Sequence, residues 1–317
     1  MDKEFFNVVV QSVDRQSDHI VSLTLEHPLG QDLTRWHPGA HVDVQLPNGL
    51  VRQYSLCSDP EDGRSWRIAV FREPDGRGAS AYVHDELKQG TKLQVRAPRN
   101  NFPMCPAERY LFIAGGIGIT PIISMVRSAA QQDVPWDLVY LGRNQNSMAF
   151  LSEINTFGDN ARIHTSQDSG PYPLNDLVCQ LAPGTAVYAC GPQKLLDVLE
   201  EASQGWADPS ALHCERFSRD PGGIAAVLPN SSFVVELGDG TEVPVPPELS
   251  ILEALESVGV NPVNSCREGI CGTCETPVLA GEIDHRDTLL SPAEREAGTT
   301  MMICVSRCRG TRLVLDL

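Results

Sequence analysis

Apolar and polar side chains alternate through the first third of the chain. The alternation runs through four segments, namely Phe5–Val10, Ile20–Leu25, Val42–Leu46 and Trp66–Phe71. A period of two residues is typical of β-strands with one buried face. Turn residues such as Pro47-Asn48-Gly49 separate the segments. Strands this frequent predict a closed β-barrel over residues 1–103, interrupted by one short helix near Ala79–Leu87.

From about residue 104 the pattern changes to continuous apolar runs separated by helical stretches. The runs at Tyr110–Ala114, Leu138–Leu141 and Ala186–Cys190 predict buried strands. Helices are expected from Pro121 and over Gln193–Ser203. Strands that alternate with helices predict a parallel α/β sheet over residues 104–226, with ligand sites at the carboxyl ends of its strands.

A third domain is predicted over residues 231–317, after a linker marked by Pro221-Gly222-Gly223 and Pro229-Asn230. It begins with an expected strand at Phe233–Leu237 and a helix at Ile251–Ser257. The fold class is therefore multi-domain α+β. This last domain has 14 acidic and 6 basic residues, a net charge of −8. Such a surface attracts a basic partner protein, although charge alone fits a solvated face equally well.

Composition narrows the class of protein. A chain of 317 residues with 41% hydrophobic and 21% charged residues indicates two or three globular domains. The net charge of −16 argues against binding to nucleic acid or to an anionic membrane surface. The sequence has neither a run of about eighteen apolar residues nor the features of a signal peptide at its start. Ten cysteines in such a chain predict a reducing, cytoplasmic setting, where clustered thiolates bind metal more often than they form disulfides.

The strongest chemical pattern is the run from Cys266 through Cys271 to Cys274. Its C-x4-C-x2-C spacing, with a distant further cysteine, is typical of a plant-type 2Fe-2S site. Two irons bridged by two sulfides need four thiolates, and a short loop supplies three of them. We expect the glycines at 269 and 272 to bend this loop and aim N–H groups at the sulfurs. A zinc site is the alternative, and both Cys304 and Cys308 are candidates for the fourth ligand.

Two short motifs in the barrel are compatible with a flavin. Arg52-Gln53-Tyr54-Ser55 ends a predicted strand, and its side chains suit a phosphate, an isoalloxazine face and a ring nitrogen. Arg77-Gly78-Ala79-Ser80 opens the short helix, whose positive end suits a phosphate. Taken alone, the first motif fits a buried tyrosine beside a surface arginine, and the second fits an ordinary turn with a helix cap.

A glycine-rich segment, Ala114–Pro121, follows a predicted strand and opens a helix. Its glycines allow close approach to a pyrophosphate, and we expect Thr120 to cap the helix with Pro121 at its first position. The pattern differs from G-x-G-x-x-G, and a tight strand-to-helix turn is the plain alternative. Cys190-Gly191-Pro192 ends another strand at the same sheet edge, where Cys190 is either a packing residue or a nicotinamide contact. The isolated cysteines are interpreted as packing residues: Cys57, Cys105, Cys179 and Cys214.

In their order along the whole chain, these motifs resemble those of the phthalate dioxygenase reductase family, which includes vanillate demethylase reductases. The matching series is R-x-Y-S, R-G-A-S, G-G-I-G-I-T-P, C-G-P, C-E-R-F and the cysteine pattern. The resemblance implies a flavin-binding β-barrel, an NAD-binding α/β domain and a C-terminal β-grasp ferredoxin domain. It also implies FMN, NADH and a 2Fe-2S cluster, with a Rieske-type oxygenase as the electron-accepting partner of a monomeric reductase. Ala79 stands where relatives often have a second glycine.

The resemblance assigns roles to particular residues. Those expected at the reacting centre are Ser55, Cys190 and Phe217, the last covering the flavin. Those expected to bind flavin or nucleotide are Arg52, Gln53, Tyr54, Ser55, Val70, Arg72, Gly78, Ala79, Ser80, Gly116, Gly118, Ile119, Thr120, Arg143, Cys190, Gly191, Pro192 and Phe217. The cluster ligands it implies are Cys266, Cys271, Cys274 and Cys304. Two alternatives stay open, an FAD- and NADPH-dependent reductase and a zinc-bound scaffold without redox function.

Overall fold

The computed structural model describes residues 4–74, 76, 78–217 and 230–317. The chain divides into two compact units, Met1–Arg216 and Phe217–Leu317, which are described separately below. The linker predicted from the glycines and prolines at 221–229 lies outside the described residues, apart from Asn230 at its end.

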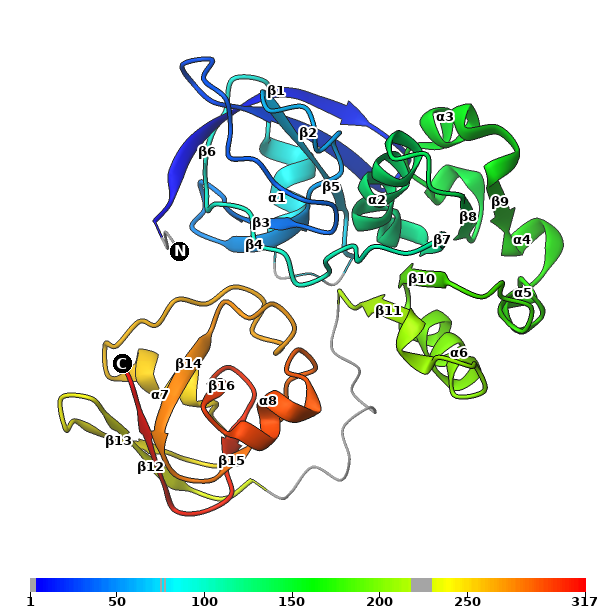
Figure 1. Cartoon of the computed structure of the whole chain (residues 1–317). Coiled ribbons are helices and arrows are strands. Elements are labelled where there is room, and N and C mark those ends of the chain that lie inside the picture. The colour runs from blue at the N-terminus through cyan, green and yellow to red at the C-terminus, as the bar shows by residue number, and fades with distance from the viewer. Residues whose placement is uncertain (1–3, 75, 77, 218–229) are drawn as a thin grey trace. The chain divides into compact units, whose positions relative to one another are not determined.

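The first unit begins with a six-stranded antiparallel barrel (Figure 1). Its strands are β1 (Phe6–Arg15), β2 (Ile20–Glu26), β3 (His41–Gln45), β4 (Val51–Ser55), β5 (Ser65–Phe71) and β6 (Lys92–Val95). The spatial order is β4-β3-β6-β1-β2-β5. Beyond β4, the Cys57 N–H donates to the Arg67 carbonyl of β5 at 2.8 Å, which brings the two outer strands together. Alternating side chains such as Val8, Val10, Leu23 and Leu25 fill the interior, as the period of two predicted.

The rest of the first unit is a five-stranded parallel sheet with helices on both faces. Its order is β11 (Leu212–Glu215), β10 (Thr185–Cys190), β7 (Arg109–Gly115), β8 (Trp136–Gly142) and β9 (Ala161–Thr165). The longer helices are α2 (Ile119–Gln131) and α6 (Gln193–Ser203). Short helices are α3 (Leu151–Ile154), α4 (Ser166–Ser169) and α5 (Leu174–Val178), and 3-10 turns cover Gly116–Gly118, Gln145–Ser147, Asn155–Asn160 and Pro209–Ala211.

The barrel and the parallel sheet share one apolar core. Cys57 and Phe102, which belong to the barrel side, lie in the same buried cluster as Ile122 and Met125 of α2. A Cβ atom on Gly39 would lie 1.9 Å from the Phe102 carbonyl oxygen, so glycine permits this close approach. The packing holds α2 against the barrel, which fixes the motif at the start of that helix relative to the motif at the end of β4.

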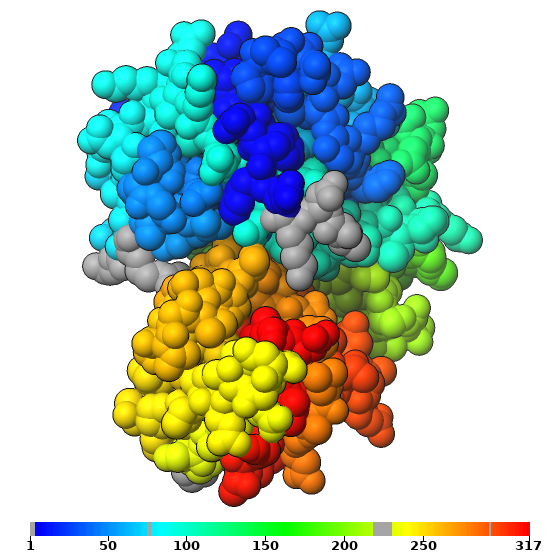
Figure 2. All heavy atoms as spheres, turned by 90° about the vertical axis from the view of Figure 1, so that its left-hand side faces the viewer, coloured from blue at the N-terminus to red at the C-terminus, as the bar shows by residue number. Residues whose placement is uncertain are grey.

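The second unit is a small mixed sheet with one helix packed on it. The order is β13 (Glu242–Val245), β12 (Phe233–Leu237), β18 (Arg312–Leu315), β14 (Glu275–Ala280) and β16 (Thr300–Met302). Figure 2 shows the yellow residues that begin this unit in contact with the red residues of the C-terminus, and β12 and β18 pair in parallel. A two-stranded sheet joins β15 (Ile283–Asp284) to β17 (Arg307–Cys308), and the helices are α7 (Ile251–Ser257) and α8 (Pro292–Ala297). Four residues of α7 are buried in the core of this unit.

The predicted fold class is confirmed, since barrel, parallel α/β sheet and small C-terminal sheet follow one another in the expected order. The prediction that all four isolated cysteines pack inside is wrong for Cys105 and Cys179, which are exposed, while Cys57 is buried and Cys214 partly buried. Both exposed thiols lie in connections between elements, which run over the surface. Among the described residues, no helix has the length and apolar character needed to cross a bilayer.

Candidate cofactor sites

The predicted flavin segment forms the end of β4, and contacts with the neighbouring strand β3 hold it in place. Tyr54 pairs with Val42, and the buried Ser55 pairs with His41 on β3. The Gln53 amide lies 3.4 Å from the carboxylate of Asp43. Asp43 is fully buried and forms ion pairs with Arg96 at 3.0 Å and Arg99 at 2.8 Å. The buried pairs hold the strand on which this segment is displayed. Burial also raises the pKa of the Tyr54 phenol, which therefore stays protonated.

The second predicted flavin motif opens α1 (Ala79–Glu86), an eight-residue helix. Gly78 caps it with φ of 90°, a left-handed conformation that favours glycine. Ala79 and Ser80 are buried, and the Ser80 hydroxyl accepts the Glu73 N–H at 3.1 Å. Small residues at the positive end of a helix suit a phosphate, and the phosphate site at this motif stays a prediction. Arg77 of the same motif lies outside the described residues.

Two further contacts fasten α1 to β5. The Val70 carbonyl lies 3.0 Å from His84 Nε2, and Arg72 binds Asp85 through two hydrogen bonds of 2.6 and 2.8 Å. Arg72 was predicted to bind a cofactor, and that role stays a prediction. In the structure its guanidinium pairs with the Asp85 carboxylate and so also holds the helix that carries the motif at 78–80.

The nicotinamide motif is a 3-10 turn at Gly116–Gly118 that leads directly into α2. The helix begins at Ile119, two residues before the predicted start. The expectation that Thr120 caps it is wrong, because its hydroxyl donates to the Ile117 carbonyl at 3.0 Å from inside the helix. The preceding turn already supplies the helical geometry, so no side-chain cap is used.

Three glycines let this turn contact the loop after β10 backbone to backbone. A Cβ on Gly118 would lie 2.2 Å from the Cys190 carbonyl oxygen, and one on Gly115 would lie 2.7 Å from Cδ of Pro192. A Cβ on Gly191 would in turn lie 3.0 Å from Cα of Gly115. The structure therefore brings the two predicted nucleotide segments together, as parallel strands ending at one sheet edge require. Gly115 and its packing role were not singled out in the sequence.

Tyr140 on β8 also holds this turn, and sequence reasoning missed it. Its hydroxyl donates to the Gly116 carbonyl at 3.1 Å and accepts the Ala149 N–H at 2.9 Å. In the sequence Tyr140 lies inside a predicted apolar strand, and nothing distinguishes it from its neighbours there. Arg143 follows β8 at the same sheet edge, and its carbonyl accepts the Gln167 N–H at 3.0 Å.

Glu215 at the end of β11 is a second residue that sequence reasoning missed. It lies beside Cys190 in the parallel register, and among the described residues its Oε2 atom is buried without a hydrogen-bond partner. Burial raises its carboxyl pKa to about 8, and burial together with the Glu215 charge raises the pKa of the Cys190 thiol. Both side chains are thus uncharged near neutral pH. Phe217, predicted to cover the flavin, follows β11 and is 41% exposed.

The cysteine loop lies between α7 and β14 in the second unit. Gly269 and Gly272 both have φ of 72°, and Arg267 has φ of 60°, so the loop turns tightly as predicted. The Glu268 N–H points at Cys266 Sγ, 3.2 Å away. The sulfurs of Cys274 and Cys304 are 3.1 Å apart.

The thiols of this loop interact strongly with one another. Hydrogen bonds from Cys271 and Cys304 hold the pKa of Cys266 far below its usual range, and the same contacts raise the pKa of the two donors. Cys308 is oriented elsewhere, toward the Arg312 carbonyl at 3.4 Å and the Gly310 N–H at 3.2 Å. Of the two candidates for the fourth ligand, Cys304 is therefore the one that faces the loop.

The loop fits a two-iron cluster by its chemistry. It offers four neighbouring sulfurs, three of them buried, with a backbone N–H aimed at the fourth, and thiolate donors of this kind bind Fe–S clusters. No three His, Cys, Asp or Glu side chains among the described residues have the arrangement of a site for a single metal ion.

Comparison with known proteins identifies two domain families within the chain. Residues 234–309 match the family model of the 2Fe-2S iron-sulfur cluster binding domain, and residues 112–201 match that of the oxidoreductase NAD-binding domain. A putative toluene-4-sulfonate monooxygenase system reductase subunit from Comamonas testosteroni is 42% identical over 316 residues, 98% of each chain. The solved structure of phthalate dioxygenase reductase is 34% identical, with a TM-score of 0.75 over 99% of this chain and 98% of that one.

An intact type IV self-sufficient cytochrome P450 monooxygenase is also similar, with 40% identity and a TM-score of 0.87 over 99% of this chain. The present chain spans only 41% of that longer protein. Fold, sites and matches together define an oxidoreductase that combines an NAD-binding domain with a 2Fe-2S domain. The chain belongs to the phthalate dioxygenase reductase family.

Proposed function

We propose that this protein is the NADH-dependent reductase component of a two-component Rieske-type oxygenase, with FMN in its barrel. The observation that carries the proposal is the presence, in one chain, of a nucleotide turn beside a flavin-like barrel and a loop of four interacting cysteines. NADH releases two electrons as a hydride, whereas a 2Fe-2S cluster accepts one. A bound flavin supplies the chemistry that links the two, because it exchanges electrons either in pairs or singly.

The protein's own residues bind and orient these groups. Arg52 would neutralise a flavin phosphate, Tyr54 would lie against the isoalloxazine face, and the Ser55 hydroxyl would reach a ring nitrogen. The start of α1 at Gly78–Ser80 binds the phosphate. An FMN has one phosphate and no adenosine, which suits a single short helix end. Acid release of the flavin followed by chromatography distinguishes FMN from FAD.

The turn at Gly116–Gly118 and the loop at Cys190–Pro192 form the nucleotide side of the site. The close approach of their backbones would let a dinucleotide lie against them, and Arg143, which follows β8 at the same sheet edge, would meet its adenosine end. Uncharged Cys190 and Glu215 next to this surface avoid placing a carboxylate or thiolate beside the nicotinamide. Steady-state rates with NADH and NADPH test the preference for NADH.

One experiment tests the electron path as a whole. NADH is added to the purified protein without oxygen, and absorbance is followed at wavelengths where flavin and cluster bleach separately. We expect the flavin to bleach first and the cluster afterwards. A colourless protein that contains zinc, or a flavin that bleaches while the cluster stays oxidised, would contradict the proposal.

The proposed electron acceptor is an oxygenase, which the similarity to a monooxygenase system reductase subunit supports. We also propose that the protein is a cytoplasmic monomer, and sedimentation analysis tests the monomeric state. The similarity to a self-sufficient cytochrome P450 supports a second candidate, electron delivery to a haem oxygenase. Reoxidation of the reduced protein by a purified Rieske-type oxygenase, compared with reoxidation by a P450 haem domain, separates the two candidates.

A further inference from the structure

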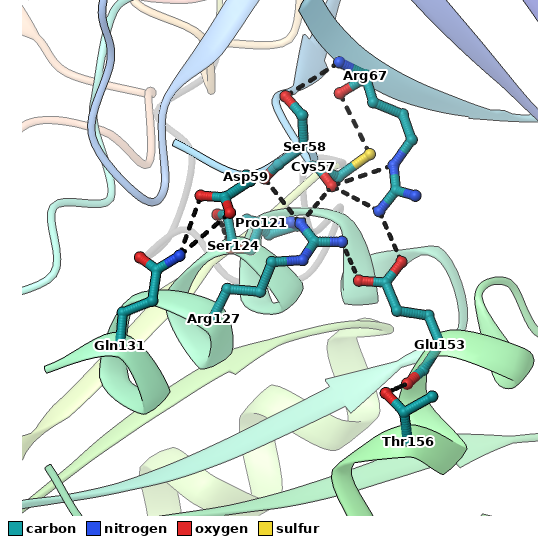
Figure 3. Close-up of polar contacts among 10 residues, drawn as sticks. All are labelled: Cys57, Ser58, Asp59, Arg67, Pro121, Ser124, Arg127, Gln131, Glu153 and Thr156. Carbon is teal, nitrogen blue, oxygen red and sulfur yellow. Dashed lines mark hydrogen bonds and ion pairs between the residues drawn. The ribbon is translucent and has the colours of Figure 1, made fainter. Parts of the chain in front are cut away.

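Three charged side chains connect the flavin side of the first unit with the nicotinamide side (Figure 3). Arg67 lies in β5 of the barrel, Arg127 in α2 and Glu153 in α3. We call these three residues the Glu153 cluster. None of them belongs to the predicted cofactor contacts, and the sequence spacing gives no sign that they meet.

The carboxylate of Glu153 bridges the two arginines. Its Oε2 accepts from Arg67 Nη2 at 2.9 Å, and its Oε1 accepts from Arg127 Nη2. The side chains of Arg67, Arg127 and Glu153 are 24%, 16% and 27% exposed, so water screens these contacts only in part. The Arg67 guanidinium also lies over the Phe150 ring, 4.4 Å from its centre, which fixes its plane.

Both arginines use their remaining N–H groups on the backbone just beyond the flavin segment. Arg67 donates to the Cys57 carbonyl from Nε at 3.2 Å and from Nη2 at 2.8 Å. Arg127 donates from Nη1 to the carbonyls of Cys57 at 2.8 Å and Ser58 at 2.7 Å. Cys57 is two residues after Ser55. The helix that begins at the nicotinamide turn is therefore bonded to the chain that leaves the flavin segment.

A second contact, near the Glu153 cluster, also joins α2 to the segment that follows β4. Gln131, one turn after Arg127 on α2, donates to the Asp59 carboxylate at 3.1 and 3.3 Å. These bonds join the same two segments at a more exposed position. The Glu153 cluster differs from this contact because its two cations approach one carbonyl oxygen and repel each other unless the carboxylate lies between them.

We propose that Glu153 is a positioning residue for hydride transfer, a role that depends on the proposed function. By neutralising Arg67 and Arg127 it keeps both guanidinium groups on the Cys57 carbonyl and so sets the distance between the nicotinamide turn and the flavin segment. Hydride transfer needs reacting atoms about 3–3.5 Å apart, and a misplacement of about 1 Å costs about 100-fold in rate. Glu153 touches neither cofactor segment, so it acts through the two arginines.

The test is Glu153→Gln, which keeps the shape of the side chain and removes its charge. Flavin reduction by NADH is followed by anaerobic stopped flow over a range of NADH concentrations. We expect the limiting reduction rate to fall about 10- to 100-fold, with NADH affinity and flavin content within about twofold of wild type. Electron transfer from the dithionite-reduced protein to an external one-electron acceptor should be unchanged, since that step does not use the nicotinamide.

Asp137→Asn is the matched control. It removes a carboxylate that binds Arg109 at 2.6 Å near the start of β8, the end of the strand opposite the predicted nucleotide edge. This variant should reduce its flavin at the wild-type rate. Arg127→Lys is a second test, because it keeps the positive charge and loses the forked donation to the two carbonyls. It should share the defect of Glu153→Gln.

The outcomes separate the two proposals. A wild-type protein whose flavin is not reduced by NADH overturns the proposed function. A wild-type protein that is reduced normally, with variants at Glu153 and Arg127 that match its limiting rate, overturns the positioning role alone. Loss of flavin or of thermal stability in both variants, with an unchanged limiting rate in the flavin-loaded fraction, also overturns it, because that pattern indicates a structural contact only.

Discussion

Replacing Gly118 with alanine forces apart the two backbone segments that form the nucleotide side of the site. The new Cβ would lie 2.2 Å from the Cys190 carbonyl oxygen, 2.5 Å from its carbon and 2.8 Å from the Gly191 nitrogen. All three are backbone atoms, which cannot rotate away as a side chain does. Carbon atoms in contact are normally about 3.5–4.0 Å apart, so the turn and the end of β10 must separate by about 1 Å.

The expected cost follows from this displacement. Overpacking of a close-packed site destabilises a protein by about 1–3 kcal/mol, and a shift of about 1 Å in a bound reactant costs about 100-fold in rate. We therefore expect Gly118→Ala to lower the free energy of unfolding of the first unit by about 1–3 kcal/mol. In the flavin-loaded protein we expect a clear rise in the NADH concentration needed for half-maximal flavin reduction, together with a slower limiting rate.

Gly205→Ala, just after α6 in the same unit, provides the control. Its Cβ would meet only the Ala202 carbonyl oxygen at 3.6 Å, an ordinary contact. Denaturant titration and stopped-flow reduction are measured on both variants. The reasoning is refuted if Gly118→Ala matches Gly205→Ala in stability and in reduction by NADH, because the close backbone approach would then have no consequence.

Three further predictions test the other sites. Cys304→Ser should lose its iron and sulfide, whereas Cys308→Ser should retain them because its sulfur faces away from the loop; equal iron contents, measured by metal analysis, would contradict this assignment. The free energy of unfolding should fall as pH rises from about 4.5 to 8. The reason is that the folded state keeps Glu215 protonated to about pH 8, whereas the unfolded chain releases that proton near pH 4.5. The resulting loss of stability is at most about 5 kcal/mol. Glu215→Gln should remove this part of the pH dependence, as shown by denaturant titrations at several pH values, and an unaltered dependence would argue against it. Asp43→Asn leaves two arginines without their buried carboxylate and should cost about 3–5 kcal/mol, with weaker flavin retention; a variant with wild-type stability would show that the pairs contribute nothing.

The sequence predicted those features that depend on neighbours along the chain. Alternation of apolar residues placed β1, β2, β3 and β5 within a few residues of their observed ends, except that β1 continues to Arg15, whereas β6 was not predicted. Continuous apolar runs placed β7, β8 and β10, and the spacing of Cys266, Cys271 and Cys274 identified the loop. Such patterns are readable because strand period, helix period and loop length are local properties of the backbone.

The strands β9 and β11 were not predicted, because each is a short segment with partly exposed residues. Their identity as strands comes from hydrogen bonds to a neighbour distant in sequence. The same is true of Glu215, whose place beside Cys190 depends on the register of β11 against β10. The sequence alone therefore does not show that the Glu215 carboxyl is buried at the end of β11, because its burial depends on that pairing.

The sequence by itself determined which chemical groups the protein carries and in which order, because each motif is encoded by a few adjacent residues. Tertiary structure decided which of them meet. It turned Cys304 toward the loop and Cys308 away, paired Arg72 with Asp85, and brought Arg67 and Arg127 to the Cys57 carbonyl with Glu153 between them. The physical reason is that side-chain contacts across 13 to 86 positions depend on packing and strand register, which no local pattern records.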